Sequence, residues 1–372
     1  MRLSDFDYSL PPSQIAQNPL PNRDASRLLL IDRVFGVFED RMFAQFPDLL
    51  EGNELLVLNN ARVIPARLLG RRATNTSTFS RARTLAKSQS APTHSRQDEI
   101  EILLSRPLDD GTWEALVRPG KKMPIGQKVL FGEGQLEAEV MARGEHGQRT
   151  LRFISHDNKN LLAHLDHLGH IPLPPYIDRA DDASDRERYQ TVFASNPGAI
   201  AAPTAGLHFT PETLEKIRRR GIEICEITLH VGLGTFLPIR RETLESHVMH
   251  SESYEIPTET AQRITRAKKE RRKILAVGTT AVRALEDAAL RASESGSQEL
   301  VASGKAQAQL FITPGFSFRI IDALLTNFHL PKSTLLALVS AFAGRENILT
   351  AYRHAVNASY RFYSYGDCML IR

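Results

Sequence analysis

The fold is decided by the stretch Lys273-Ile274-Leu275-Ala276-Val277-Gly278-Thr279-Thr280, in which an apolar run of strand length meets a glycine and two threonines. An apolar run of this length that is bounded by a turn residue predicts a buried strand. Threonines directly after the turn favour the start of a helix, which we expect to end near Arg291. The stretch therefore predicts a strand–turn–helix unit, which is the repeating element of an α/β domain.

The segments on either side of this unit continue the alternation of strands and helices. Strands are expected at residues 28–31, 55–58, 222–231 and 309–312, and helices after Thr210, after Thr258 and over 334–343. Pro211 is typical of the first position of a helix, because the N–H that proline lacks is not needed there. The helix after Ser333 is apolar on nearly all sides and is expected in the interior. The alternation predicts a large α/β sandwich domain with a mixed, largely parallel sheet.

The chain between residues 61 and 154 has a different pattern, with many short strand-like runs separated by turns such as Asp109-Asp110-Gly111. This pattern predicts a small antiparallel β-barrel. Residues 73–97 interrupt it with a segment rich in Ser, Thr, Ala and Arg that has no apolar periodicity, which we interpret as a disordered surface insertion. We therefore expect a discontinuous α/β catalytic domain, 1–60 and 155–372, and an inserted barrel domain, 61–154.

The composition excludes several classes of protein. The 372 residues include only two cysteines, Cys225 and Cys368, which are too few for a disulfide scaffold or an iron–sulfur cluster. No run approaches the length of about 20 apolar residues that a membrane span needs, and the start lacks the apolar run of a signal peptide, so we expect a cytoplasmic protein. His247 and His250 lack further ligands, so no metal site is predicted. A net charge of +4 permits a polyanionic partner without requiring one.

Two glycine-containing turns follow expected strands and are candidate ligand sites. In the first, Gly232 and Gly234 let the backbone approach a ligand and Thr235 can donate a hydrogen bond, although a simple tight turn is the alternative. In Gly278-Thr279-Thr280, the N–H groups at the helix start can hold a carboxylate or phosphate, whereas ordinary N-capping is the alternative. Such junctions lie at the carboxyl ends of parallel strands, where α/β proteins bind ligands.

Several polar and aromatic residues stand out near apolar neighbours. His208 and His329 each lie in such a position, where a histidine is more often a packing residue than a catalyst. Asn327 carries a donor and an acceptor that suit the edge of a nucleobase. The segment 360–367 interleaves tyrosines with an arginine, and we favour a terminal strand packed on the sheet over a surface for base stacking.

Taken together, seven strings resemble the S-adenosylmethionine:tRNA ribosyltransferase-isomerase family of queuosine biosynthesis. The strings occupy residues 59–68, 171–179, 201–209, 230–236, 277–283, 327–333 and 362–367. They occur in the order of that family and span nearly the whole chain. Two positions depart from the usual family residues, Ala61 in place of threonine and Leu233 in place of alanine.

The resemblance implies an activity, two substrates and a state of assembly. S-adenosylmethionine is implied as a co-substrate, and the partner is tRNA that carries 7-aminomethyl-7-deazaguanine at the wobble position of its anticodon stem-loop. The implied products are epoxyqueuosine in tRNA, adenine and methionine. Members of the family are described as cytoplasmic monomers with a barrel inserted in an α/β domain.

The resemblance also suggests roles for the candidate residues. Gly278, Thr279 and Thr280 would hold the methionine carboxylate or a tRNA phosphate, and Gly232, Gly234 and Thr235 would line the same pocket. His208, His230 and His329 are candidates for the general base that the reaction needs, and the sequence does not separate them. Arg62 and Arg67 are expected to contact the tRNA backbone, with surface salt bridges as the alternative, and Asn327 to contact the substrate.

Two other functions remain open at the level of sequence. A conventional S-adenosylmethionine-dependent tRNA methyltransferase would release S-adenosylhomocysteine and no adenine. A non-catalytic tRNA-binding protein would bind with a steep dependence on salt and consume no co-substrate.

Overall fold

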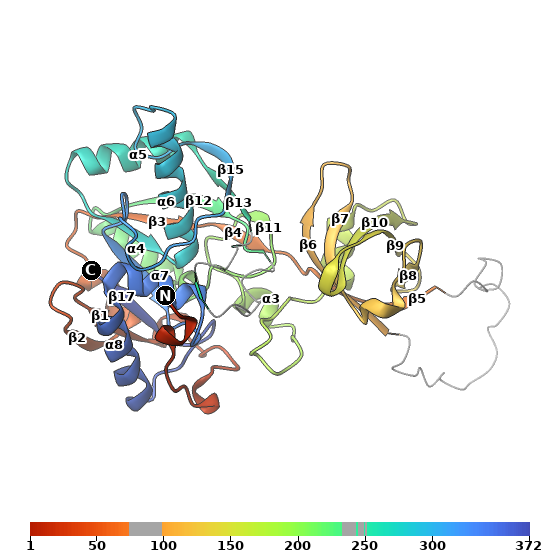
Figure 1. The fold of residues 1–372 in the computed structure, drawn as a ribbon, viewed down its shortest axis with the longest axis horizontal. Coiled ribbons are helices and arrows are strands. Elements are labelled where there is room, and N and C mark those ends of the chain that lie inside the picture. Colours follow the sequence, from red (N-terminus) through yellow and green to blue (C-terminus); the bar gives the residue numbers. More distant parts are fainter. Residues whose placement is uncertain (74–98, 233–242, 245–248, 250) are drawn as a thin grey trace. The chain divides into compact units, whose positions relative to one another are not determined.

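The computed structural model describes residues 1–73, 99–232, 243–244, 249 and 251–372 of the chain (Figure 1). Contacts within the chain define two compact units, one formed by Met1–Val63 with Leu173–Arg372 and the other by Ile64–Pro172. The second unit starts and ends later than the expected range 61–154, because residues 61–63 pair with a strand of the first unit and a helix follows the last barrel strand. Apart from Ala73, the insertion expected at 73–97 lies outside the described residues.

A mixed nine-stranded sheet organises the first unit, in the order β15-β13-β12-β3-β14-β16-β17-β1-β2. Its strands are β1 (Arg27–Ile31), β2 (Phe38–Met42), β3 (Leu55–Asn59), β12 (Glu223–Leu229), β13 (Glu252–Ile256), β14 (Ile274–Val277), β15 (Gly304–Ala308), β16 (Ala323–Asn327) and β17 (Cys368–Ile371). The four adjacent strands β12, β3, β14 and β16 run parallel. Their carboxyl ends therefore lie at one edge of the sheet, which is where ligands bind in α/β proteins. A separate parallel pair joins β4 (Ala61–Val63) to β11 (Asn196–Ala199).

Helices cover both faces of this sheet. The helices of the unit are α1 (Phe46–Leu49), α3 (Asp185–Arg188), α4 (Pro211–Arg219), α5 (Thr258–Lys269), α6 (Thr279–Glu294), α7 (Thr334–Ala343) and α8 (Arg345–Asn357), and all of these except α3 contribute to the two cores of the sheet. Because side chains alternate along a strand, Leu55 and Val57 of β3 face one hydrophobic core, while Leu56 and Leu58 face another. The first core includes residues of α5, α6, α7 and α8, and the second includes residues of α1 and α4.

Local sequence explains where several of these elements begin and end. The Thr210 hydroxyl accepts the N–H of Thr213 at 3.1 Å, and the Ser333 hydroxyl caps α7 in the same way through the N–H of Leu336. The prediction of a strand at 309–312 is wrong. The strand in this part of the chain is β15, which ends at Ala308 because its antiparallel partner β13 begins opposite that residue.

The second unit contains a closed six-stranded antiparallel barrel, in the order β10-β7-β6-β5-β8-β9. Its elements are β5 (Arg67–Arg72), β6 (Glu99–Pro107), β7 (Trp113–Arg118), β8 (Lys128–Phe131), β9 (Leu136–Arg143), β10 (Gln148–Ser155) and the following helix α2 (Leu161–Leu168). Ile100, Ile102 and Leu104 of β6 alternate with less buried residues and fill the interior. Gly70 is needed there, since a Cβ atom would come within 2.6 Å of Phe131.

The predicted fold class, a mixed and largely parallel sheet in an α/β unit with a small antiparallel barrel, is confirmed. Within the described parts of the chain, no helix is long and apolar enough to cross a membrane.

Candidate functional site

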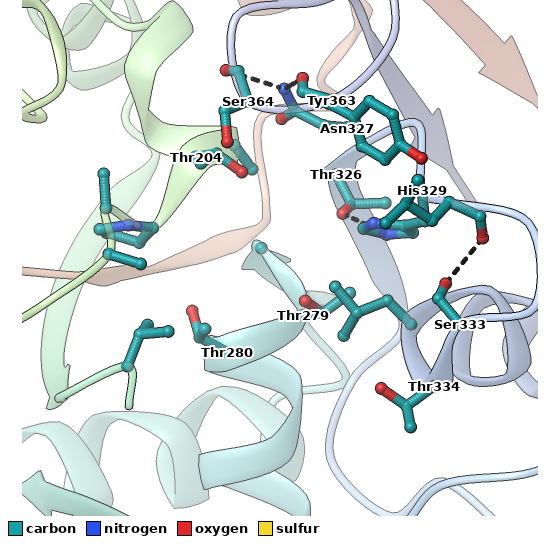
Figure 2. A pocket seen from close by; sticks show the side chains of 18 of the residues that line it. Thr204, Thr279, Thr280, Thr326, Asn327, His329, Ser333, Thr334, Tyr363 and Ser364 are labelled. Atoms are coloured by element: carbon teal, nitrogen blue, oxygen red, sulfur yellow. Dashed lines mark hydrogen bonds between the residues drawn. The ribbon is translucent and has the colours of Figure 1, made fainter. Parts of the chain in front are cut away.

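A cavity of about 260 Å³ lies in the first unit where β14 and β16 end (Figure 2). Gly278, Thr279 and Thr280, which follow β14, form part of its wall, and Asn327 and His329 line it from the end of β16. Its volume is close to the lower end of the roughly 300–1,000 Å³ range of small-molecule sites. The cavity is therefore a candidate site for a small ligand at the edge of the sheet where one was expected.

The N-terminus of α6 is one wall of this cavity. Gly278 has a φ of +90°, a conformation that L side chains rarely adopt, and it redirects the chain from β14 into the helix. Among the described residues, no side chain caps the start of this 16-residue helix. The Thr280 hydroxyl accepts a hydrogen bond from Nδ2 of Asn59 at 3.2 Å, so its own proton can be donated to a ligand. Uncapped N–H groups and an oriented hydroxyl suit a carboxylate or phosphate.

A buried ion pair stands beside the helix start. Arg283 lies one turn further along α6 and pairs with Glu252, the first residue of β13; the two side chains are 7% and 4% exposed. One carboxylate oxygen of Glu252 accepts the bond from Arg283, and the other accepts the N–H of Gly232 at 3.2 Å. Arg283 and Glu252 both line the cavity. The pair therefore joins α6, β13 and the backbone at Gly232 beside the cavity.

Of the three candidate histidines, His329 is the one that lines the cavity (Figure 2). Its Nε2 shares a hydrogen bond of 3.1 Å with the hydroxyl of Thr326, and its backbone N–H donates to the hydroxyl of Tyr352. Burial lowers the pKa of His329 to about 3. The ring is therefore neutral at neutral pH, and a neutral imidazole can accept a proton.

His208 and Asn327 form a hydrogen-bonded pair. Nδ1 of His208 is 2.7 Å from the Ser26 hydroxyl and Nε2 is 3.3 Å from Oδ1 of Asn327. Nδ2 of Asn327 donates to the carbonyl of Tyr363 at 2.9 Å. Burial lowers the pKa of His208 to about 4. Asn327 lines the cavity, but both ends of its side-chain amide already have partners in the protein, and His208 does not belong to the lining.

The candidate residues in and beside the first glycine-containing turn are not part of the cavity lining that the structure describes. His230 does not line the cavity; its ring packs on Gly198, where a Cβ atom would come within 3.0 Å of it. Burial lowers the pKa of His230. Gly232 lies next to Val231, which is part of the lining. Gly234 and Thr235 lie outside the described residues.

The two arginines expected to contact RNA are not part of the cavity. Arg62 is exposed on β4 of the first unit. Arg67 belongs to the barrel unit, is half-buried, and its backbone exchanges hydrogen bonds with that of His170.

The sequence interpretation missed three residues at the site. Asn59, which orients Thr280, and the pair Glu252 and Arg283 were not among the expected site residues. A signal for Arg283 was present, because it stands in the otherwise apolar run 281–285 of a helix that packs on the sheet. A cation within such a run indicates a buried partner.

The free energy of unfolding is expected to fall as the pH drops from about 6.5 towards 4, because His208 and His329 are buried as neutral rings. The unfolded chain binds these protons near the ordinary histidine pKa and the folded chain only at lower pH, so protons favour unfolding in this window. Each ring contributes up to about 1.4 kcal/mol per pH unit. Urea unfolding at several pH values measures the slope, and the variant His208→Gln should show a shallower one. Equal slopes in the two proteins would contradict this origin.

Comparisons with known proteins bear on the whole chain. A family model described as "Queuosine biosynthesis protein" matches residues 3–371. The S-adenosylmethionine:tRNA ribosyltransferase-isomerases of Solibacter usitatus and Desulfitobacterium hafniense are 49% and 45% identical, and each match covers 100% of both chains. A crystal structure of S-adenosylmethionine tRNA ribosyltransferase from Thermotoga maritima is 36% identical, with a TM-score of 0.52 over 99% of this chain and 100% of that one. The chain therefore belongs to the queuosine biosynthesis family of S-adenosylmethionine:tRNA ribosyltransferase-isomerases, which are enzymes.

Proposed function

We propose that this enzyme transfers the ribosyl moiety of S-adenosylmethionine to 7-aminomethyl-7-deazaguanine at the wobble position of tRNA and isomerises it. The products are epoxyqueuosine-tRNA, adenine and methionine. The observation that supports this function most strongly is the match along the whole chain to relatives that carry the name of this activity. S-adenosylmethionine acts as a co-substrate, and no metal takes part.

S-adenosylmethionine binds in the cavity at the ends of β14 and β16. Its methionine carboxylate lies at the start of α6, where the N–H groups of Thr279 and Thr280 and the Thr280 hydroxyl receive it. Support comes from the uncapped helix start and from the bond with which Asn59 orients Thr280. The proposal also assigns Gly232, Gly234 and Thr235 to S-adenosylmethionine binding; Gly232 follows Val231 of the lining, and Gly234 and Thr235 lie outside the described residues.

His329 is the general base. The positive sulfur makes the adjacent ribose C–H acidic, and His329 takes this proton while the electrons that remain expel adenine. The departing adenine takes up the proton held by His329. The aminomethyl nitrogen of the tRNA base then bonds to the ribosyl fragment and loses a proton, and the fragment rearranges as its carbon–sulfur bond breaks and methionine leaves with the electron pair. His329 is preferred to His208 and His230 because it lines the cavity and they do not.

The partner is the anticodon stem-loop of tRNA, whose phosphates Arg62 and Arg67 contact. A guanidinium is suited to this because it donates two parallel hydrogen bonds to a phosphate. Each contact is expected to contribute to the dependence of tRNA affinity on salt. Asn327 acts on the substrate indirectly, through the backbone that it holds.

The enzyme works as a monomer in the cytoplasm, where its tRNA substrate is found. Light scattering of the purified protein tests the first statement, and a mass corresponding to a dimer or larger assembly would contradict it. Cell fractionation tests the second.

Replacing Thr280 by valine is expected to raise the KM for S-adenosylmethionine about tenfold, because the variant keeps the shape of the side chain and loses the hydroxyl that meets the carboxylate. Thr280→Ser keeps the hydroxyl and serves as the matched control, with a KM close to that of the wild type. Steady-state kinetics at saturating tRNA separate the two, and equal KM values for both variants would count against the carboxylate site.

The function itself is tested by incubating the pure protein with S-adenosylmethionine and tRNA that carries the deazaguanine precursor. Adenine, methionine and an epoxide-bearing nucleoside should form in equal amounts. Formation of S-adenosylhomocysteine would instead indicate a methyltransferase. Binding of tRNA without consumption of S-adenosylmethionine would indicate a non-catalytic protein.

A further inference from the structure

Tyr363 stands in an unusual backbone conformation at the edge of the cavity. Its φ is +72°, in the left-handed region that residues other than glycine rarely adopt. The tight turn that contains it depends on Asp367, whose carboxylate accepts the N–H of Arg361 at 2.7 Å, and on Gly366, where a Cβ atom would come within 2.5 Å of the Arg361 carbonyl oxygen. A rare conformation that is held in place at a cavity points to a role in binding.

Tyr363 is only 5% exposed, and its buried hydroxyl has no hydrogen-bond partner among the described residues. Tyr363 lines the cavity, and Figure 2 shows its hydroxyl end pointing toward the His329 side. Burial raises the pKa of Tyr363, so the hydroxyl stays protonated and is a donor at neutral pH. A buried donor without a partner is destabilising in the empty protein, and a ligand with an acceptor atom can satisfy it.

A series of hydrogen bonds fixes the backbone carbonyl of Tyr363. Nδ2 of Asn327 donates to the Tyr363 carbonyl at 2.9 Å. Oδ1 of Asn327 is 3.3 Å from Nε2 of His208, whose Nδ1 is 2.7 Å from the hydroxyl of Ser26. Because His208 and Asn327 bond to each other, the orientation of one fixes that of the other.

The ring of Tyr363 is also fixed. It stacks on Tyr176 with ring centroids 4.4 Å apart and planes at 20°. The Tyr176 hydroxyl shares a hydrogen bond of 2.6 Å with the hydroxyl of Ser364, the next residue of the turn. Phe328 and Tyr189 also line the cavity. Four aromatic rings therefore belong to the lining, and aromatic surfaces suit a planar purine.

We propose that Tyr363 is a substrate-binding residue whose hydroxyl donates a hydrogen bond to a ring nitrogen of the adenine of S-adenosylmethionine, and that Asn327 and His208 are positioning residues that present it. The proposal rests on the proposed function, because it deepens the assignment of the cavity to S-adenosylmethionine. Every adenine ring nitrogen that does not carry the ribose is an acceptor, so a single donor is sufficient. When the methionine carboxylate lies at the start of α6, the adenine occupies the part of the cavity that the aromatic rings line. His208 thereby acts through Asn327 and not as the base.

Tyr363→Phe is the direct test, because it removes only the hydroxyl. Isothermal titration of the full-length variant should show affinity for S-adenosylmethionine and for adenine reduced about tenfold, and binding of methionine unchanged. The melting temperature of the ligand-free variant should equal or exceed that of the wild type, because a buried donor without a partner is gone. Tyr254→Phe is the matched control. The Tyr254 hydroxyl donates to Asp287 at 2.8 Å outside the cavity, so this variant should melt lower and bind S-adenosylmethionine normally.

The positioning roles are tested with a double-mutant cycle. His208→Ala should weaken binding of S-adenosylmethionine in the wild type and much less in Tyr363→Phe, because both changes act on one hydrogen bond. His208→Gln keeps groups that can bond to Ser26 and Asn327 and should retain most of the affinity. Fully additive losses, or a Gln variant no better than Ala, would overturn the positioning role.

Two outcomes of the titrations have different meanings. A Tyr363→Phe protein that binds adenine and S-adenosylmethionine as tightly as the wild type overturns the role of Tyr363 and leaves the proposed function standing. A wild-type protein that binds neither compound overturns the proposed function, and the role of Tyr363 with it.

Discussion

Replacing Arg283 by methionine is expected to lower the free energy of unfolding by about 3–5 kcal/mol, the largest change in stability that we predict for a single residue. Methionine fills a similar space, but the buried carboxylate of Glu252 then loses the ion pair with Arg283. Arg283 also donates to the carbonyl of Leu310 at 3.3 Å. Urea unfolding followed by circular dichroism measures the difference.

The double variant Arg283→Met with Glu252→Gln is the control for this prediction. Its neutral amide removes the buried negative charge and can still accept the N–H of Gly232, so it should recover part of the lost stability. If the single and double variants are equally unstable, charge burial is not the cause.

Replacing His329 by glutamine is expected to lower kcat by about 100- to 10,000-fold, because the reaction would lose the general base that we propose. Glutamine can preserve the hydrogen bond to Thr326, so the fold and the affinity for S-adenosylmethionine should change little. Single-turnover formation of adenine is the measurement to use, since it isolates the chemical step from product release.

His230→Gln is the matched control for the base. His230 lies outside the lining of the cavity, so the His230→Gln enzyme should retain most of its activity. If His230→Gln loses activity as His329→Gln does, or if His329→Gln turns over normally, His329 is not the base.

The sequence predicted the elements of the fold better than their arrangement. The caps at Thr210 and Ser333 and the turn at Gly278 are local features, and each marks a helix start in the structure. The order of the sheet is not local, because β3 lies between β12 and β14, which are far from it in the chain. The segment 360–367 was expected to be a terminal strand and is a turn, with the strand β17 following it.

At the site, too, the sequence predicted residues that depend on local features and missed those that depend on distant contacts. Thr279 and Thr280 were predicted to bind a ligand from the junction in which they stand, and they line the cavity. Asn59 was missed because it meets Thr280 across 221 positions of sequence. His208 and His329 had similar apolar neighbours in the sequence, and only the folded structure shows that His329 lines the cavity and His208 does not.

A crystal structure of the protein with S-adenosylmethionine bound tests most directly whether the cavity at the ends of β14 and β16 is the substrate site. We expect the methionine carboxylate within hydrogen-bond distance of the N–H groups of Thr279 or Thr280, and the adenine beside Tyr363. S-adenosylmethionine bound at any other place, with this cavity left free, would contradict the assignment.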